Sequence, residues 1–397
     1  MPQRHLPTGT VRSIQGAARA AVRRRAAALV LLLTPLGLLV APAGAGAATL
    51  GFPNVPVAAD RTDGVGWTTL VVGSTVYVGG SFGTVRNPSG TVVGTRANLA
   101  AFDATTGRLR TGFRADTNDQ VTDLATDGTN LYVVGRFTTV NGVARGRIAA
   151  VDPATGAVRT GWVANSTGLV NSVAVGGSRL YVGGSFGSVG GAARPRIAAL
   201  RRTDGSVDTG FSTQVDSTVI AVGAQPDGSR VYLGGGFTTV NGASRPWLAS
   251  VDGTTGALAG PAFSGQSGPT LDIDVPPGGT RLAVATGGSG NQGAWFSLTS
   301  GSKQWRQRCD GDGQAVKVID TVLYSGFHES CDGDTTVRLT ANSTSSGARL
   351  STFRPTFDRF WGVRDLEGTS SVLSVAGDFT RVGGVAAQGF ALFRSTG

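Results

Sequence analysis

The sequence predicts an all-β protein made of repeated units, and three observations support this prediction. The chain of 397 residues contains 62 glycines and only 15% charged residues, whereas helical bundles and coiled coils need charged, glycine-poor helix faces. Hydrophobic residues make up 40% of the chain, which excludes a disordered polyelectrolyte. A glycine-rich segment recurs along nearly the whole length, and no window carries a helical apolar stripe of useful length.

The first 48 residues differ from the rest and predict a secretory signal peptide. They carry six arginines and no acidic residue, then an apolar run over residues 26–40 and an Ala-Gly-Ala sequence at residues 45–47 that fits signal peptidase. The apolar run is shorter than the roughly 20 residues that span a bilayer. We therefore expect residues 1–48 to be removed and the product to be exported, without a transmembrane segment. Arg24-Arg25 leaves the export route, general secretory or twin-arginine, open.

The charged and catalytic residue types limit the function. Without the six leader arginines, the formal net charge of +10 falls to +4. The remaining arginines are scattered singly, whereas nucleic-acid binding needs a clustered basic face, so we expect no nucleic-acid partner. Two histidines, two cysteines, two glutamates and two lysines leave little material for histidine-centred catalysis or cysteine-rich metal sites.

Internal repeats predict the architecture. The segment at residues 131–142 recurs at 180–191 and 231–242, and shorter copies lie near residues 76, 282, 323 and 373. A turn glycine follows a short apolar strand in each unit, at intervals of 45 to 51 residues: Gly107, Gly156, Gly205, Gly256, Gly301, Gly347 and Gly397. Seven units of about 50 residues account for nearly all of residues 49–397, which predicts a single domain.

Each unit predicts four short strands. In the third unit we expect them at residues 170–175, 179–183, 196–200 and 206–211. Four-stranded units repeated seven times predict a seven-bladed β-propeller. The chain ends where a fourth strand should begin, so we expect the N-terminal strand at residues 49–60 to complete the last blade and close the ring.

The repeat also resembles a known family. The phrase Gly-Gly-x-Phe-Thr-Thr-Val-Asn-Gly, followed by Arg, by Ile-Ala-Ala-Val-Asp and by a Thr-Gly turn, is similar to the delta-60 repeat of secreted bacterial β-propeller proteins. The resemblance covers about residues 60–395 and is clear in the first four units but weak in the fifth and sixth. It implies an extracellular β-propeller and very little about activity, because the repeat is defined by structural residues.

The recurrent side chains predict scaffold. Phenylalanines at one repeated position are expected to pack between blades: Phe82, Phe137, Phe186, Phe237, Phe327 and Phe379. Four equivalent arginines are expected to pair with strand-end aspartates or to bond to neighbouring carbonyls: Arg96, Arg145, Arg194 and Arg245. Function should therefore be sought where the repeat pattern breaks.

The first break contains both cysteines. In an exported protein with only two cysteines, Cys309 and Cys331 predict a disulfide. The bridge would gather carboxylates from two Cys-Asp-Gly-Asp sequences and from a nearby glutamate: Asp310, Asp312, Asp332, Asp334 and Glu329. Clustered carboxylates repel unless a cation or arginines neutralise them, so these residues are a candidate Ca²⁺ site, with solvated turns as the alternative. No other cofactor is expected.

The second break lies just before and inside the innermost strand of the last unit. Innermost strands line the central channel, so Trp361, with Trp67 and Asn171 at comparable places, predicts an aromatic and polar mouth that holds a sugar or a peptide. The alternative is that Trp361 plugs the channel or packs between blades. The candidate polar partners of the aromatic mouth are Asp358, Arg364 and Asp365.

The sequence therefore predicts a secreted, noncatalytic β-propeller, expected as a monomer, that binds an extracellular protein or carbohydrate. Two alternatives stay open. A glycan-active hydrolase or lyase would use aspartates at the channel mouth, with Asp358, Asp365 or Asp123 as acid and base, although their spacing does not single them out. A structural protein of the cell envelope is the second alternative, because similar blades offer flat edges to partners.

Overall fold

The computed structural model describes residues 51–395, and the predicted signal peptide at residues 1–48 lies outside the described residues. The described chain is almost entirely strands and turns, with one short 3-10 helix, η1 (Gly288–Gly290). The all-β prediction is therefore confirmed. Between residues 51 and 395, no helix combines the length and the apolar character needed to cross a membrane.

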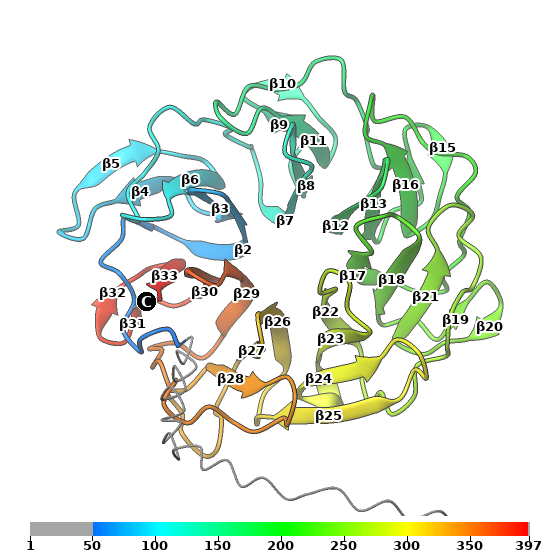
Figure 1. Ribbon diagram of the computed structural model, residues 1–397. Coiled ribbons are helices and arrows are strands. Elements are labelled where there is room, and N and C mark those ends of the chain that lie inside the picture. Colours follow the sequence, from blue (N-terminus) through cyan, green and yellow to red (C-terminus); the bar gives the residue numbers. More distant parts are fainter. Residues whose placement is uncertain (1–50, 396–397) are drawn as a thin grey trace, which may run out of the picture. The chain divides into compact units, whose positions relative to one another are not determined.

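Seven sheets of three or four antiparallel strands follow one another along residues 51–395 (Figure 1). In chain order their strands are β2 (Val65–Val72), β3 (Thr75–Ser81) and β6 (Leu99–Asp103); β7 (Val121–Thr126), β8 (Leu131–Gly135) and β11 (Ile148–Val151); β12 (Val170–Gly176), β13 (Arg179–Gly184) and β16 (Ile197–Arg201); β17 (Val219–Ala224), β18 (Arg230–Gly235) and β21 (Leu248–Asp252); β22 (Thr270–Asp274), β23 (Arg281–Thr286), β24 (Gln292–Ser297) and β25 (Lys303–Arg308); β26 (Gly313–Ile319), β27 (Val322–Phe327) and β28 (Leu339–Ser343); β29 (Gly362–Thr369), β30 (Val372–Asp378) and β33 (Phe390–Arg394).

Short accessory strands lie between the second and third strands of five sheets. They are β4 (Thr84–Arg86) and β5 (Val92–Thr95), which pair with β1 (Arg61–Thr62), and the hairpins β9 (Thr139–Val140) with β10 (Val143–Ala144), β14 (Ser188–Val189) with β15 (Ala192–Ala193), β19 (Thr239–Val240) with β20 (Ala243–Ser244), and β31 (Arg381–Val382) with β32 (Val385–Ala386).

The seven sheets are arranged around a common centre. The first strand of each sheet contacts the first strand of the next, and β29 of the last sheet contacts β2 of the first. The first strands are therefore innermost, as Figure 1 shows. All six phenylalanines predicted to pack between blades are buried. The core is thus divided into clusters between neighbouring sheets, such as the one that joins Tyr77 of β3 and Phe113 of the first unit to Val133 of β8.

The prediction of four strands is correct for one sheet and wrong for the others. Only β22 to β25 form a four-stranded sheet among the described sheets. In five other sheets the expected fourth strand is a short returning segment that pairs with the third strand at one residue, as Val207 does with Leu200. The spacing of glycines explains the difference. In the second unit only four residues separate Gly156 from Gly161, so the chain turns again before a strand can form. In the fifth unit nine residues without glycine follow Gly301, which leaves room for a full strand.

The predicted turn glycines are confirmed within the described chain. Their φ angles lie between 68° and 80°, in the left-handed region that favours glycine: Gly107, Gly156, Gly205, Gly256, Gly301 and Gly347. The four recurrent arginines bond to carbonyls, for example Arg96 Nε to the Phe113 carbonyl at 3.0 Å. The strand-end carboxylate of Asp103 pairs instead with Arg110 at 2.9 Å.

The segment that precedes β1 lies against the last sheet. Val57 N donates to the Leu392 carbonyl in β33 at 2.7 Å. The same hydrogen bond joins the returning segment to the third strand in other sheets, as from Asp208 N to the Ala199 carbonyl at 2.9 Å. Phe52 is buried in a cluster with residues of the sixth and seventh sheets, and its ring centroid lies 5.8 Å from that of Tyr324.

Candidate functional site

The first strand of every sheet carries a bulge at the same place. At each bulge the pairing with the second strand skips one residue. A bulge redirects the side chain of the extra residue. The seven residues skipped in this way line one central cavity of about 360 Å³: Trp67, Thr122, Asn171, Ile220, Leu271, Gln314 and Arg364. This volume falls within the usual range for ligand pockets, about 300–1,000 Å³.

Arg364 lies between two tryptophan rings at this cavity. Its guanidinium carbon is 4.7 Å from the ring centroid of Trp67 and 5.1 Å from that of Trp361. Both distances lie within the roughly 6 Å over which a cation is attracted to an aromatic face. Trp361 directly precedes β29 and is 47% exposed, which is incompatible with packing between sheets. The structure therefore places Trp67 and Trp361 beside Arg364, and Asn171 in the lining of the same cavity. Their role as a binding site stays a prediction.

The guanidinium of Arg364 makes no ion pair in the described part of the chain. Its Nε is buried without a hydrogen-bond partner. When the Gln314 amide is oriented to donate to the Trp361 carbonyl at 3.0 Å, its oxygen accepts from Arg364 Nη1 at 3.3 Å. Burial lowers the pKa of Arg364, but an arginine stays charged at neutral pH. Asp378 interacts with Arg364 electrostatically from a longer distance. The cavity therefore contains a positive charge that no described carboxylate contacts directly.

An aromatic rim extends from Trp361. Phe360 is also 47% exposed, and the His328 ring lies 5.2 Å from Phe360 and 5.4 Å from Trp361, measured between centroids. His328 Nδ1 lies 4.0 Å from a carboxylate oxygen of Asp312. His328 comes from the segment between the two cysteines, and Phe360 and Trp361 come from the segment just before β29. Both interruptions of the repeat pattern therefore contribute to the aromatic rim.

Three aspartates lie one residue after the bulge, in the second, fifth and seventh sheets. Asp123, Asp272 and Asp365 line a smaller cavity of about 90 Å³, which shares its lining with the larger one. Each carboxylate accepts one N–H from its own strand and one from the next sheet. The donors are Leu124 N and Val173 N to Asp123, at 2.7 Å each, Ile273 N at 2.7 Å and Val316 N at 2.8 Å to Asp272, and Leu366 N at 2.8 Å and Thr69 N at 2.7 Å to Asp365.

These aspartates connect neighbouring sheets and are hard to ionise. Burial raises the pKa of Asp123 to about 6 and that of Asp272 to about 7. Burial raises the pKa of Asp365 as well, and the nearby carboxylates of Asp272 and Asp123 add to this rise. Since both oxygens of each carboxylate already accept backbone N–H groups, the three side chains act first as links between sheets.

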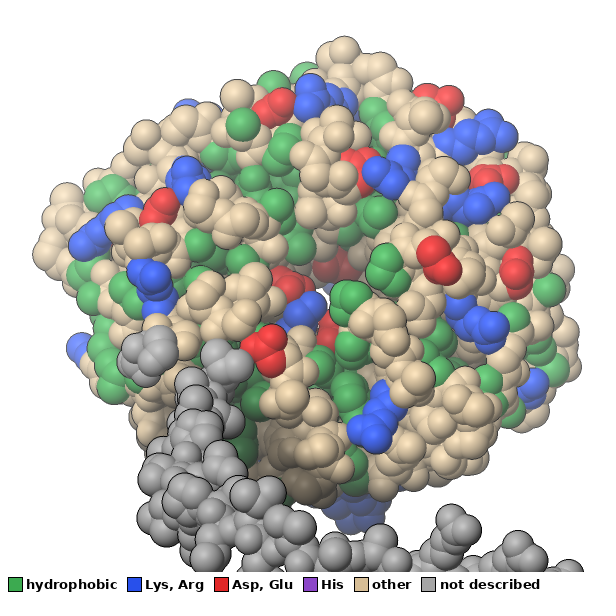
Figure 2. All heavy atoms as spheres, in the orientation of Figure 1, with side chains coloured by type: hydrophobic (Ala, Val, Ile, Leu, Met, Phe, Trp, Pro, Cys, Tyr) green, Lys and Arg blue, Asp and Glu red, His purple; other side chains and the backbone are tan. Residues whose placement is uncertain are grey.

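A second group of charges lies two residues further along the first strands. Lys317 Nζ is 3.0 Å from Asp274 and 3.0 Å from Glu367, so this lysine is neutralised by two carboxylates on neighbouring sheets. The space-filling view shows acidic and basic side chains inside the central hollow (Figure 2).

Asp358 does not line the cavity. Its carboxylate accepts from the backbone N–H groups of Thr380 at 2.9 Å and Arg381 at 3.0 Å, at the hairpin of β31 and β32. Asp216 binds Thr238 and Thr239 in the same way in an earlier unit. Asp358 therefore occupies a repeated structural position, away from Asp365 and Asp123.

Sequence reasoning missed ten residues that line the two cavities: Gln120, Thr122, Arg136, Leu169, Ser172, Ile220, Ala221, Leu271, Asp272 and Gln314. Two signals could have found some of them. Arg136 replaces the small residue found at the same place of other units, Ser81 and Ser185. Asp272 stands at the same place of its strand as Asp123 and Asp365, followed in each case by Leu or Ile.

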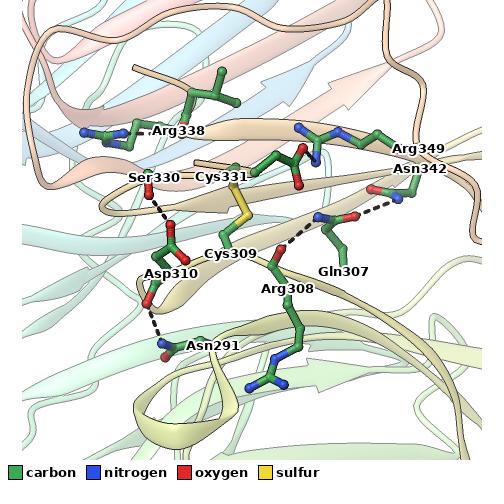
Figure 3. The surroundings of a disulfide bond; sticks show 12 residues. Asn291, Gln307, Arg308, Cys309, Asp310, Ser330, Cys331, Arg338, Asn342 and Arg349 are labelled. Carbon is green, nitrogen blue, oxygen red and sulfur yellow. Dashed lines mark hydrogen bonds and ion pairs between the residues drawn. A yellow bond between two sulfur atoms is a disulfide. The ribbon is translucent and has the colours of Figure 1, made fainter. Parts of the chain in front are cut away.

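The predicted disulfide is confirmed. Cys309 and Cys331 are bonded, with their Cα atoms 4.5 Å apart, and Cys331 is fully buried (Figure 3). Beside the bridge, Asp310 accepts from the Ser330 hydroxyl, and its carbonyl accepts from Asn291 Nδ2 at 2.7 Å. The bridge ties the connection between β25 and β26 to the loop after β27.

The carboxylates predicted for calcium have separate partners. Asp332 pairs with Arg349 at 2.9 Å and Asp334 with Arg354 at 3.2 Å. Asp312 accepts from Gly288 N at 2.6 Å, and the backbone N–H of Glu329 donates to the Phe360 carbonyl. In residues 51–395, no three His, Cys, Asp or Glu side chains are grouped so that they could hold a metal ion. The Ca²⁺ site stays a prediction.

A larger hollow of about 680 Å³ lies between the fourth and fifth sheets, lined by residues that include Arg230, Tyr232 and Phe263. It is more open to solvent than the central cavity, and no cation stacked on an aromatic ring is found in its described lining. We therefore place the candidate site at the centre.

Comparison with known proteins supports a β-propeller. The family model described as "Domain of unknown function (DUF5122) beta-propeller" matches residues 178–211, which run from β13 past β16. The crystal structure of the computationally designed Ika8 protein is similar to this chain, with a TM-score of 0.54 and 13% identity over 87% of this chain and 100% of that chain. At this identity the similarity concerns the fold alone. No curated protein matches the chain, and the resemblance to the delta-60 repeat stays a prediction.

Proposed function

We propose that this protein is an exported seven-bladed β-propeller that binds an extracellular carbohydrate at the mouth of its central channel and catalyses no reaction on it. Seven sheets around one centre support seven blades. The hydrogen bond from Val57 to Leu392 supports closure of the last blade by the N-terminal segment. The disulfide between Cys309 and Cys331 supports an oxidising, extracellular location.

The stack of Trp67, Arg364 and Trp361 at the cavity carries this proposal. An exposed indole offers a flat apolar face, against which the C–H face of a sugar ring can pack. Polar groups beside it can bind hydroxyls. Asn171 donates to the Val219 carbonyl at 2.9 Å, and its amide oxygen has no partner among the described residues, so it can accept from a sugar hydroxyl.

The protein should be tested against a glycan panel by tryptophan fluorescence and calorimetry. We expect at least one glycan to change the emission, because two tryptophans border the cavity. Trp361→Ala should weaken that binding by about tenfold or more, since it removes the exposed face. Trp305→Phe is the matched control, because Trp305 lies on the outermost strand β25 and packs against Gly347.

Two outcomes would contradict the proposal: no glycan binds, or Trp361→Ala binds as tightly as the unaltered protein. If an extracellular protein binds instead, and Trp361→Ala abolishes that complex, the same mouth serves a protein partner.

One observation favours a second candidate function, a glycan-active enzyme. Asp123 and Asp272 have pKa values raised to about 6 and 7, and such values are common among acid catalysts. Release of new reducing ends from a bound glycan, lost in Asp272→Asn, would support the enzyme. Binding without any release would support the noncatalytic module.

A further inference from the structure

We propose that the carbohydrate bound at the mouth is acidic, and that a carboxylate on a sugar ring pairs with Arg364. This inference rests on the proposed function and names the chemical class of its ligand.

Lys317 and Arg364 are the two basic side chains on the innermost strands, and they differ in their ionic partners. Lys317 is neutralised by Asp274 and Glu367, each 3.0 Å away. Arg364 is the bulge residue of β29, whereas Lys317 lies three residues after the bulge residue of β26. Arg364 has no ion pair among the described residues, and its Nε is buried without a hydrogen-bond partner. A partly buried cation without an anion is unfavourable, and an anionic ligand would remove this cost.

The two tryptophans lie close to the guanidinium, and this arrangement is compatible with a carboxylate at its edge. Trp67 and Trp361 both lie within 5.1 Å of its carbon, measured from their ring centroids. Stacked rings cover the faces of a planar guanidinium and leave hydrogen donors on its edge. A carboxylate binds such an edge through two parallel hydrogen bonds, which a hydroxyl cannot do.

Hydrogen-bond donors set the depth at which the ligand carboxylate can bind. Asp123, Asp272 and Asp365 lie one residue beyond the bulge and already accept the backbone N–H groups there, so an anion that went deeper would find no free donor among them. Arg136 lines the same cavity, is exposed, and makes no ion pair in the described chain, so it offers a second positive contact. A single acidic group at the level of Arg364 therefore fits best.

The lining favours a sugar over an acidic peptide. Trp361 and Phe360 are each 47% exposed beside the cavity, and they offer flat rings to C–H faces. The amide oxygen of Asn171 adds an acceptor that matches a hydroxyl.

The test compares oligosaccharides that differ only in charge. Oligogalacturonate and oligoalginate are titrated against their methyl esters by tryptophan fluorescence, with oligoglutamate as the peptide probe. We expect each bound acid to bind at least about tenfold more tightly than its ester, with affinity that falls as salt rises. Arg364→Gln should bind acid and ester equally. Arg306→Gln, at an exposed position of the outermost strand β25, is the matched control and should keep the preference.

Arg364→Lys is the second variant, to be used if Arg364→Gln does not fold. It keeps the charge but loses the planar edge, so it should retain part of the preference for the acid. Equal binding of acid and ester by the unaltered protein would overturn the carboxylate pairing while the proposed function stands. Binding of oligoglutamate alone would overturn the sugar class. If neutral and acidic glycans all fail to bind, both the inference and the proposed function are wrong.

Discussion

Two turn glycines share one backbone conformation but differ in the space around them. Gly156 and Gly142 have φ angles of +79° and +78°. A Cβ on Gly156 would lie 2.2 Å from the Arg114 carbonyl oxygen, whereas a Cβ on Gly142 would meet nothing within 4 Å. The first glycine is therefore required by conformation and by packing between units, and the second by conformation alone.

These positions give a matched pair of mutations. Gly142→Ala should lower the free energy of unfolding by about 1 kcal/mol, the usual cost of a left-handed alanine. Gly156→Ala should lower it by about 3 kcal/mol or more, because backbone of the neighbouring unit must move. Urea unfolding of both variants measures the difference. Equal losses would show that the contact with Arg114 is relaxed at no cost.

The aspartates below the mouth predict an unusual dependence of stability on pH. A carboxylate whose pKa is higher in the folded state than in the unfolded chain stabilises the fold in its protonated form. This contribution is present below about pH 4 and is lost as the pH rises through the folded values of about 6 for Asp123 and about 7 for Asp272. The free energy of unfolding should thus be about 1 to 3 kcal/mol higher at pH 5 than at pH 8.

Thermal melting across this pH range measures the effect, and Asp272→Asn isolates its source. The asparagine cannot ionise and relieves the neighbouring carboxylates, so the melting temperature should change less between pH 5 and pH 8 in the variant. An unchanged slope would mean that other groups cause the dependence. Asp216, whose pKa is lowered to about 2 by hydrogen bonds from Thr238, acts in the opposite direction and only below about pH 4.

At the scale of elements, the disulfide holds the loop that completes the rim. Cys309 and Cys331 are 22 residues apart in sequence, and His328 of the aromatic rim lies within the closed loop. Replacing both cysteines by serine should lower the free energy of unfolding by about 3 kcal/mol through the entropy of the unfolded loop. It should also weaken ligand binding, because His328 and Asp312 would no longer be held beside Trp361.

Melting and titration of the serine variant, and of the unaltered protein in reductant, test both effects. The two should agree, since each removes only the bridge. Binding that stays unchanged while stability falls would show that the rim does not depend on the loop.

The elements also show what could be predicted from the sequence. Second strands and turn glycines follow local patterns, so the second strand was found in every unit and the turn glycine in the six units where that residue is described. The returning segments were predicted as strands because each follows a turn in a repeated unit, as Ser206 to Phe211 does, but a new turn after four residues prevents pairing. The fifth unit, whose repeat sequence is the most decayed, has the only complete fourth strand in the described sheets, because β25 alternates without glycine.

The site was predicted only where one residue type stood out. Trp361 and Trp67 were found because tryptophan is rare in the innermost strands, and Arg364 because it lies beside Trp361. The convergence of seven bulge residues could not be found, because a bulge appears only when two strands are paired. Asp358 and Asp365 look equivalent in sequence, yet the first holds a hairpin and the second links two sheets.

At the scale of the whole molecule, the ring depends on contacts between units that are distant in sequence. Asp365 accepts from Thr69 N at 2.7 Å, which joins the seventh sheet to the first, just as Asp123 joins the second to the third. The N-terminal segment makes a second junction, through Val57 with Leu392 and through Asp60 with Arg108 at 2.8 Å. The segment before β1 therefore lies against the last sheet, although it forms none of the strands of that sheet.

Deleting residues 49–62 should open this junction. The deletion removes the buried side chain of Phe52, which by itself is expected to cost about 3 kcal/mol, together with the hydrogen bond to Leu392. It also uncovers the edge of β33 (Phe390–Arg394), whose free backbone groups can pair with a second molecule. We expect a lower melting temperature and a concentration-dependent dimer or aggregate in size-exclusion chromatography with light scattering.

The protein that begins at residue 49 is the reference, and Val57→Pro, which removes one N–H donor, should show a smaller loss of the same kind. A deletion variant that stays monomeric with an unchanged melting temperature would mean that the ring is held closed by contacts such as Asp365 with Thr69, and that the N-terminal segment only covers its edge.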